Sequence, residues 1–136
     1  MKLELEEKLL SSYPKIFRQK DLPMNQTCMC WGIECGDGWY TLLNALCNRI
    51  QHHLDQKKDV EQVEAVQVKE KYGTLRFYIN GGDDYVDGLV SMAEDMSAFI
   101  CEQCGNAGSI RGKGWYTTRC GECHGPIRKE APNDEN

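Results

Sequence analysis

Apolar residues recur at helical spacing in three segments of the chain. The first segment carries the stripe Leu3, Leu5, Leu9, Leu10 and Tyr13. Pro14 should end this helix, because a proline restricts the residue before it and cannot donate to the helix ladder. The second and longest stripe comprises Trp39, Leu42, Leu43, Leu46, Cys47, Ile50 and Leu54. Asp37 or Gly38 can cap this second helix, which is expected to end near Gln56.

Residues 63–79 alternate between apolar and polar positions, which predicts a β-hairpin with its turn at Tyr72 and Gly73. The pairs expected on the packed face are Val66 with Ile79, Val68 with Phe77 and Glu70 with Leu75. The pairs expected on the solvent-facing side are Lys69 with Arg76 and Gln67 with Tyr78. The turn lacks an Asn-Gly signature, so a bulged or longer turn stays open, and a slip by one residue would invert the two faces.

A third helix is expected after the glycine pair at positions 81 and 82. Asp83 or Asp84 can cap this helix, and the same role accounts for both aspartates without metal binding. Its apolar side comprises Tyr85, Val86, Leu89, Met92, Ala93, Met96 and Ile100. The run Met92, Met96 and Phe99 is interpreted as core, and the helix should run directly into Cys101.

Four cysteines near the C-terminal end of the sequence have the spacing of a zinc site. Cys101 and Cys104, followed by Cys120 and Cys123, form the pattern C-x2-C-x15-C-x2-C. Two residues between cysteines let a tight turn direct both sulfurs at one ion, so we expect one structural Zn²⁺ on four thiolates. His124 is an alternative fourth ligand, because zinc also accepts imidazole; the alternative for the whole motif is four unrelated thiols.

The loop between the two cysteine pairs combines basic and aromatic side chains at a glycine-rich tip. These residues are Arg111, Lys113, Trp115, Tyr116 and Arg119. In one interpretation the basic side chains contact phosphates and an aromatic ring stacks on a base or meets a partner. In the other, which we favour, the two aromatic rings cover the zinc site, because so small a ribbon needs such cover.

A second group of cysteines lies near two histidines, and comprises Cys28, Cys30, Cys35 and Cys47 with His52 and His53. A second metal or thiol centre is conceivable. Cys47, however, lies on the apolar side of its helix, where free cysteine behaves as a small core residue. Cys35 precedes a helix start, which can activate a thiol, but the histidines lie about 20 Å farther along that helix. We therefore expect no catalytic residues, and a second ion stays an open alternative that we do not favour.

The composition bounds the architecture. A chain of 136 residues with 40% hydrophobic content suits one compact domain with a small appendage. The predicted fold class is α+β, with helices packed on a β-hairpin that forms a small antiparallel sheet, followed by a C-terminal zinc ribbon. The expected domains are an α+β body over residues 1–100, the ribbon over 101–129 and a disordered tail over 130–136.

The charge distribution limits the class of partner. A net charge of −5 argues against a general nucleic-acid binder, since neutralising phosphates requires a basic surface. Residues 1–100 carry 11 Lys/Arg against 16 Asp/Glu, whereas residues 101–129 carry five basic residues against two acidic ones. Any nucleic-acid contact should therefore fall to the ribbon. The acidic first residues are unlike a signal peptide, so a soluble cytoplasmic protein is expected.

Several segments together resemble a family of small bacteriophage and prophage proteins. They are residues 13–17 (YPKIF), 30–39 (CWGIECGDGW) and 67–78 (QVKEKYGTLRFY) with the terminal zinc ribbon, and the resemblance covers roughly residues 13–124. It implies production in a bacterial cytoplasm during infection or from a prophage. It also implies that the last metal ligand varies between cysteine and histidine. It supplies no catalytic residues.

The leading functional hypothesis is a non-enzymatic, zinc-binding phage accessory protein. We expect it to bind a host or phage macromolecule, most readily a protein, as an anti-defence or anti-CRISPR inhibitor does. The alternative is a nucleic-acid-binding regulator that acts through Arg111, Lys113 and Arg119 on phosphates and Trp115 or Tyr116 on bases. An enzyme that uses the region from Cys28 to Cys47 comes third.

Overall fold

The computed structural model describes residues 1–124. The tail expected over 130–136 and the last part of the expected ribbon, residues 125–129, lie outside the described residues. The helices are α1 (Leu3–Ser12), α2 (Tyr40–Gln56) and α3 (Asp84–Ser97), and the strands are β1 (Ile33–Glu34), β2 (Glu64–Lys71), β3 (Thr74–Asn80), β4 (Ser109–Arg111) and β5 (Thr117–Arg119). No helix within residues 1–124 is long and apolar enough to cross a membrane.

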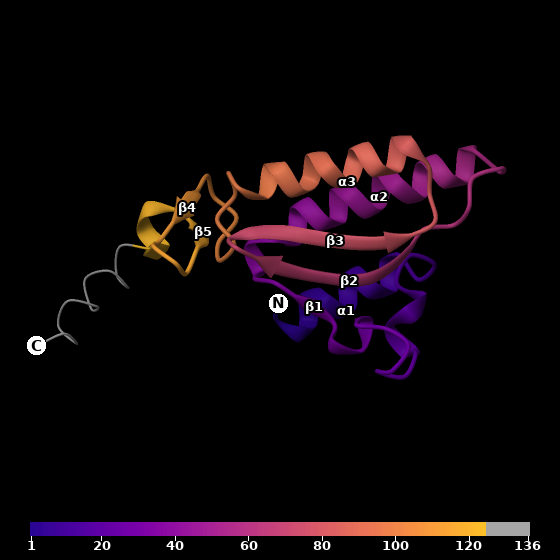
Figure 1. Ribbon diagram of the computed structural model, residues 1–136, viewed down its shortest axis with the longest axis horizontal. Coiled ribbons are helices and arrows are strands. Elements are labelled where there is room, and N and C mark those ends of the chain that lie inside the picture. Colours follow the sequence, from indigo (N-terminus) through magenta and orange to yellow (C-terminus); the bar gives the residue numbers. More distant parts are fainter. Residues whose placement is uncertain (125–136) are drawn as a thin grey trace, which may run out of the picture.

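The fold is α+β, as predicted, but its main sheet is mixed (Figure 1). The strand order is β1-β2-β3, with β2 and β3 antiparallel and β1 parallel to β2. Strand β1 extends the predicted hairpin by a third strand, in which Ile33 lies opposite Val68. The prediction of a purely antiparallel sheet was therefore incomplete. The third strand lies within residues 17–36 and has two residues, which is too short to show an alternating pattern in the sequence.

The register of the β2–β3 hairpin follows the prediction near the turn and departs from it at the far end. All predicted pairs from Gln67 with Tyr78 to Glu70 with Leu75 are present. The pairing of Val66 with Ile79 was wrong, because a bulge between Ala65 and Gln67 places Ala65 opposite Ile79. The turn has two residues with positive φ, 55° at Tyr72 and 88° at Gly73, as a type I′ turn requires.

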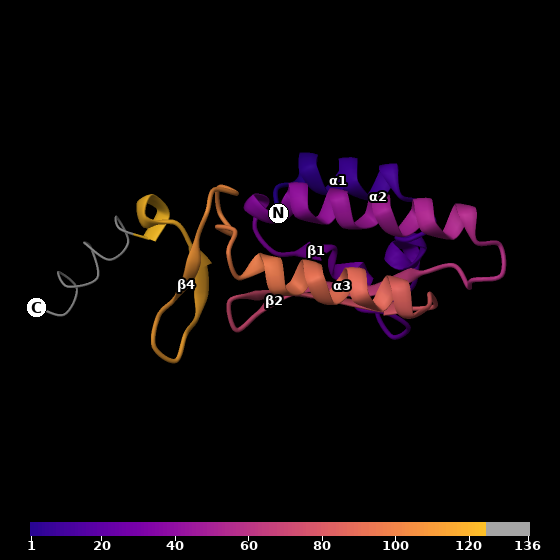
Figure 2. The ribbon, with the colours of Figure 1, turned by 90° about the horizontal axis from the view of Figure 1, so that it is seen from above.

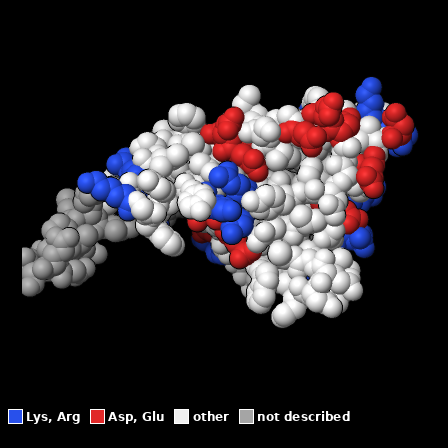
Figure 3. All heavy atoms as spheres, in the orientation of Figure 1, with Lys and Arg blue, Asp and Glu red and all other residues white. Residues whose placement is uncertain are grey.

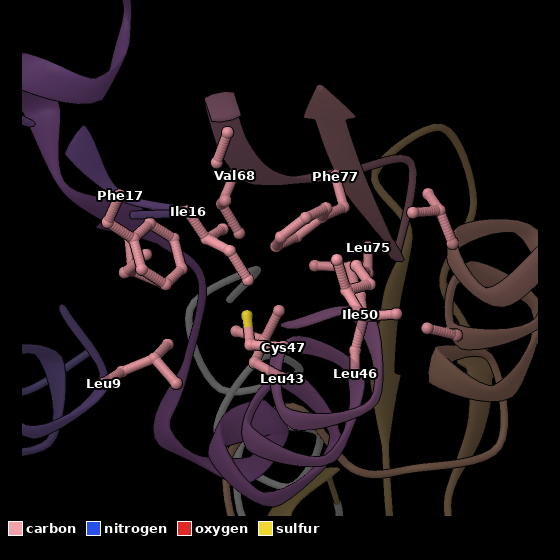
Figure 4. Packing of buried hydrophobic residues seen from close by; sticks show 14 of the residues in the cluster. Leu9, Ile16, Phe17, Leu43, Leu46, Cys47, Ile50, Val68, Leu75 and Phe77 are labelled. Atoms are coloured by element: carbon pink, nitrogen blue, oxygen red, sulfur yellow. The ribbon is translucent and has the colours of Figure 1, made fainter. Parts of the chain in front are cut away.

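Helices α2 and α3 together cover the inner face of the sheet. Figure 4 shows Val68 and Phe77 of the sheet directed toward Leu43 and Cys47 of α2. All four side chains are fully buried or nearly so. Helix α2 lies between α1 and α3 (Figure 2), so α3 is at the outside of the helical layer. Within residues 1–124, one side of α3 therefore has no neighbouring helix.

This outside position corrects the interpretation of the third apolar stripe. Helix α3 buries Val86, Val90 and Ala93, together with Ser97. Met92, Met96 and Phe99, which were interpreted as core, are exposed, and Phe99 retains 71% of its accessible surface. The buried residues follow one narrow line along the helix, because α2 and β3 are its main packing partners within residues 1–124.

The start of α3 agrees with the prediction, whereas its end does not. The carboxylate of Asp83 caps the helix by accepting a hydrogen bond from the amide of Val86 at 3.0 Å. The helix ends at Ser97 and does not continue to Cys101. The amides of Ala98, Phe99 and Ile100 continue in tighter turns onto carbonyls three positions before them. The Cys101 amide then donates to the Asn106 carbonyl at 2.7 Å, outside the helix.

Candidate metal centre

The four C-terminal cysteines lie together at the end of the molecule beyond α3. Their sulfur atoms are all within 4.8 Å of one another, and Cys104 Sγ lies 3.6 Å from Cys120 Sγ. Four thiolates around a tetrahedral zinc ion, with Zn–S bonds of about 2.3 Å, lie about 3.8 Å apart. All eight cysteines of the chain are free thiols. The cluster of Cys101, Cys104, Cys120 and Cys123 therefore has the donor set and the size of a metal site, and His124 is not part of it.

Tight turns aim backbone amides at these sulfurs. The amide of Cys123 donates to Cys120 Sγ at 3.4 Å, and the amide of Gly105 returns to the Cys101 carbonyl at 2.9 Å. Gly105 has φ of 84°, in the left-handed region that favours glycine, so the turn after Cys104 depends on this residue. Amide donors of this kind stabilise thiolates, which are the form that binds a metal.

The pKa values of the thiols shift in opposite directions. Burial acts to raise the pKa of Cys101, but backbone amides, those of Cys104 and Cys120 first, outweigh it and lower the pKa to about 6. The amide of Cys123 lowers the pKa of Cys120. The Cys120 sulfur, assisted by burial, raises the pKa of Cys123 to about 12. Sulfurs this close cannot all be anionic unless a cation balances them, and a divalent metal ion meets that need.

The first cysteine pair is docked tightly on the body of the protein. The amide of Gly38 donates to the Glu102 carbonyl at 2.7 Å, and Trp39 Nε1 donates to the Ile100 carbonyl at 2.8 Å. The Gly36 amide donates to the Glu102 carboxylate at 2.9 Å. A Cβ atom at Gly38 would lie 2.0 Å from the Cys101 carbonyl oxygen, so only glycine permits this approach.

The β4–β5 hairpin, which carries the second cysteine pair, contacts a different part of the body. The hydroxyl of Thr118 donates to the Gly73 carbonyl in the β2–β3 turn, and Thr118 is fully buried. The Thr118 carbonyl accepts the Glu102 amide at 2.9 Å, which ties the two cysteine pairs together. The C-terminal segment is therefore held both at the start of α2 and at the end of the sheet (Figure 1).

The tip of this hairpin does not cover the cysteines. Trp115 is 81% exposed and Tyr116 is 41% exposed, so the expected aromatic cover of the site is wrong. Cys101 and Cys120 are nevertheless buried. Arg111 Nε donates to the Arg119 carbonyl at 2.9 Å across the hairpin, whereas Lys113 is exposed.

The tip is consequently an open, basic and aromatic projection. Figure 3 shows basic side chains at this end of the molecule, over the part that β4 and β5 occupy in Figure 1. Arg119 Nη1 donates to Gln103 Oε1, so this arginine is engaged within the C-terminal segment. Of the five tip residues, Lys113 and Trp115 are the most available to a ligand.

The second cysteine group does not converge. Within residues 1–124, Cys28, Cys30, Cys35 and Cys47 form no shared cluster with one another or with the histidines. Cys28 and Cys30 are exposed, whereas Cys35 and Cys47 are buried in the core. Burial raises the pKa of Cys35 to about 12, which is the opposite of an activated nucleophile. Cys47 is a core residue, as expected from its helical position.

Sequence reasoning missed the residues of the α+β body that contact the turn containing Cys101 and Cys104. Gly38 was considered as a cap of the second helix and Trp39 as part of its apolar stripe, whereas Gly36 was given no structural role. The sequence did contain a signal for this contact. Two glycines that flank an aspartate before a tryptophan are poor helix formers and permit another backbone segment to approach closely. Thr118 and the β2–β3 turn carry no comparable signal, since their contact joins positions 45 residues apart.

None of the protein-family models, the curated proteins and the solved structures that were compared with the chain matches it. The fold and the site alone define its class, which is an α+β protein with a four-cysteine centre suited to a metal ion.

Proposed function

We propose that Cys101, Cys104, Cys120 and Cys123 hold one structural Zn²⁺, and that the C-terminal segment is a zinc ribbon on a non-enzymatic interaction protein. The observation that carries this proposal is the set of four sulfurs within 4.8 Å of one another. Four protein ligands fill a tetrahedral zinc ion and leave no position for water or substrate, which favours a structural role over a catalytic one.

The ion would act as a cross-link between the two cysteine pairs, which are separated by 15 residues of sequence. Strands β4 and β5 have three residues each, and a hairpin of this size is marginal in water without further support. Zinc binding supplies folding free energy to such segments. A rigid C-terminal segment, fixed on the body, then presents a defined surface to a partner.

We further propose that the partner is a protein and that the chain is a phage or prophage accessory factor that inhibits host defence in the bacterial cytoplasm. The resemblance of residues 13–124 to small phage proteins supports this source. Free thiols at all eight cysteines suit a reducing compartment. Exposed apolar side chains on α3 favour a protein partner, because contiguous exposed apolar surface marks interaction sites.

Affinity capture tests this function. The tagged protein would be expressed in phage-infected and uninfected bacteria, and captured proteins and nucleic acids would be counted by mass spectrometry and sequencing. We expect a host or phage protein to be enriched with the wild type and lost with Cys120→Ser, which removes one ligand. Recovery of no protein above the level of an untagged control would contradict the proposal.

A second candidate function follows from the exposed tip. Trp115 is free to stack on a base, and Arg111 and Lys113 lie beside it in sequence. A labelled single-stranded oligonucleotide should then bind with an affinity that falls steeply with salt and decreases in Trp115→Ala and Lys113→Ala. Absence of binding at low ionic strength would exclude this function.

A further inference from the structure

An apolar groove runs between α2 and α3 on the surface of the molecule. Its centre is a hollow of about 190 Å³. The apolar residues that define it are Leu42, Ala45 and Leu46 of α2 and Leu89, Met92 and Met96 of α3. Arg49 is the charged side chain in its lining, and its Nε already donates to the Tyr85 hydroxyl at 2.8 Å. The floor of the groove therefore offers hydrophobic contacts and little hydrogen bonding.

The groove continues toward the cysteine centre. A second hollow of about 410 Å³ shares Leu42, Ala45 and Met96 with the first and ends at residues 104–106. The turn that follows the second metal ligand thus closes one end of the groove. The α3 positions that line the groove, from Leu89 to Met96, span about 11 Å at the helical rise per residue, which matches about two turns of a second helix.

Helix α3, which supplies one side of the groove, is acidic. Helix α3 contains Asp84, Asp87, Glu94 and Asp95 and has no lysine or arginine. Figure 3 shows acidic side chains gathered over the part of the surface that α3 occupies in Figure 1. Asp84 and Asp87 lie in the first turn, where a negative charge interacts favourably with the helix dipole. The Glu94 carboxylate accepts a hydrogen bond from the Phe77 amide at 2.9 Å. Three of the four acids thus have a role within the fold.

Asp95 has no such role. It lies in the last turn of α3, where the helix dipole disfavours a negative charge. Within residues 1–124 it forms no ion pair. On the surface of α3, Asp95 lies three positions after Met92 of the groove lining, so its charge borders the apolar groove. A cationic partner would offset a charge that the fold alone leaves unfavourable.

We propose that this groove binds an amphipathic helix of a partner protein, with apolar residues in the groove and lysine or arginine residues against α3. The proposal rests on the proposed function as a protein-binding protein and adds the surface and the chemistry of the partner. Helix-in-groove binding uses apolar anchors at positions i, i+3 or i+4 and i+7. The two methionines suit it, because their flexible side chains adapt to the anchors of a partner.

Charge selects this occupant over others. A second copy of the chain that docked through the same face would oppose two acidic α3 helices, which is unfavourable. An anionic membrane surface and a nucleic acid would be repelled for the same reason. A basic amphipathic helix is the occupant that satisfies both the apolar floor and the acidic helix α3.

A peptide-binding measurement tests the proposal. The probe is a fluorescent 16-residue designed helix with leucines on one stripe and lysines beside it, and its twin carries glutamate in place of every lysine. We expect the zinc-loaded protein to bind the basic peptide at least about tenfold more tightly than the acidic twin by anisotropy. Equal binding of the two peptides, or no binding of the basic one, would overturn the proposal.

Matched variants locate the binding surface. Met92→Lys introduces a cation into the groove, and Met24→Lys introduces the same charge at another exposed methionine outside the groove lining. Affinity for the basic peptide should fall at least about tenfold in the first and stay near wild type in the second. Asp95→Asn should weaken binding without lowering the melting temperature, since it removes an unfavourable helix-end charge. Unchanged affinity in both Met92→Lys and Asp95→Asn would refute the assignment.

The same variants separate this inference from the proposed function. If affinity capture recovers a partner equally well with wild type and with Met92→Lys, the interaction function stands and the groove is not its site. If no partner is recovered while the basic peptide binds in the groove, the groove is a peptide site and the proposed function fails. Loss of the captured partner in Met92→Lys but not in Met24→Lys supports both.

Discussion

Alanine at Gly38 should disrupt the docking of the cysteine centre. The new Cβ would lie 2.0 Å from the Cys101 carbonyl oxygen and 2.6 Å from the Gly105 nitrogen. Both are backbone atoms, and ordinary carbon contacts lie at about 3.5 Å, so the whole turn that contains Cys101 and Cys104 has to move. The atoms nearest to the new Cβ all belong to the backbone, so no flexible side chain can move aside to make room for it.

The magnitude follows from the contacts that this movement breaks. The hydrogen bonds from the Gly38 amide and from Trp39 Nε1 are 2.7 Å and 2.8 Å long. Each contributes about 1 kcal/mol, and the unpaired indole N–H of the buried Trp39 adds a desolvation penalty of about 1 to 3 kcal/mol. We expect the free energy of unfolding to fall by about 3 to 5 kcal/mol, within the range of severe single mutations.

Gly88→Ala is the matched control. Gly88 lies inside α3, and a Cβ there has no heavy atom within 4 Å. Alanine should therefore raise stability by about 0.5 to 1 kcal/mol through helix propensity and the lower entropy of the unfolded chain.

Thermal melting followed by circular dichroism, with zinc content measured in parallel, distinguishes the Gly38→Ala variant from its control Gly88→Ala. At about 4 °C per kcal/mol for a domain of this size, Gly38→Ala should melt about 12 to 20 °C lower and Gly88→Ala about 2 to 4 °C higher than wild type. A Gly38→Ala protein that melts with wild type and keeps its zinc would show that the cysteine centre is not docked on the body as described.

Three further outcomes are expected. Glu64→Gln should lose about 1 kcal/mol at pH 7, because Arg18 and then Gln19 lower the pKa of Glu64 by hydrogen bonding. This stabilisation is present above the pKa of Glu64 in the unfolded chain and is lost as pH falls through its lower pKa in the folded protein. The free energies of unfolding of wild type and Glu64→Gln, measured by urea titration, should therefore become equal in acid. A difference that stays constant with pH would contradict this prediction. Brief alkylation of the zinc-loaded protein should modify the exposed Cys28 and Cys30 first by mass spectrometry, whereas early modification of all eight cysteines would exclude a bound metal. Zinc should also dissociate as pH falls, since protons compete for thiolates, and a dye-release assay that shows more release at alkaline pH would contradict this.

Sequence patterns gave the local elements well because their causes are local. The bounds of α1 and the end of α2 at Gln56 follow from apolar spacing and from Pro14. The capping aspartate of α3 was likewise one of the two predicted. The hairpin register was correct near its turn, where strand alternation leaves little freedom. The bulge at Ala65 escaped, since either Ala65 or Val66 can face the core by composition.

The errors arose where tertiary neighbours decide burial. Met92, Met96 and Phe99 are apolar at helical spacing, and periodicity alone cannot show that α3 lies at the outside of the helical layer. The exposure of Trp115 was missed for the same reason, because a composition does not state which side of a hairpin meets the metal site. The cysteine spacing was informative, since two short turns require each pair of sulfurs to converge.

Metal analysis of the purified protein tests the central claim most directly. Zinc would be measured by mass spectrometry for wild type, for Cys120→Ser and for Cys47→Ala, which changes a cysteine outside the centre. The account predicts one zinc per chain in wild type and Cys47→Ala, a loss of zinc in Cys120→Ser, and a tetrahedral thiolate spectrum when cobalt replaces zinc. Wild-type protein without zinc, or zinc retained at full stoichiometry in Cys120→Ser, would contradict it.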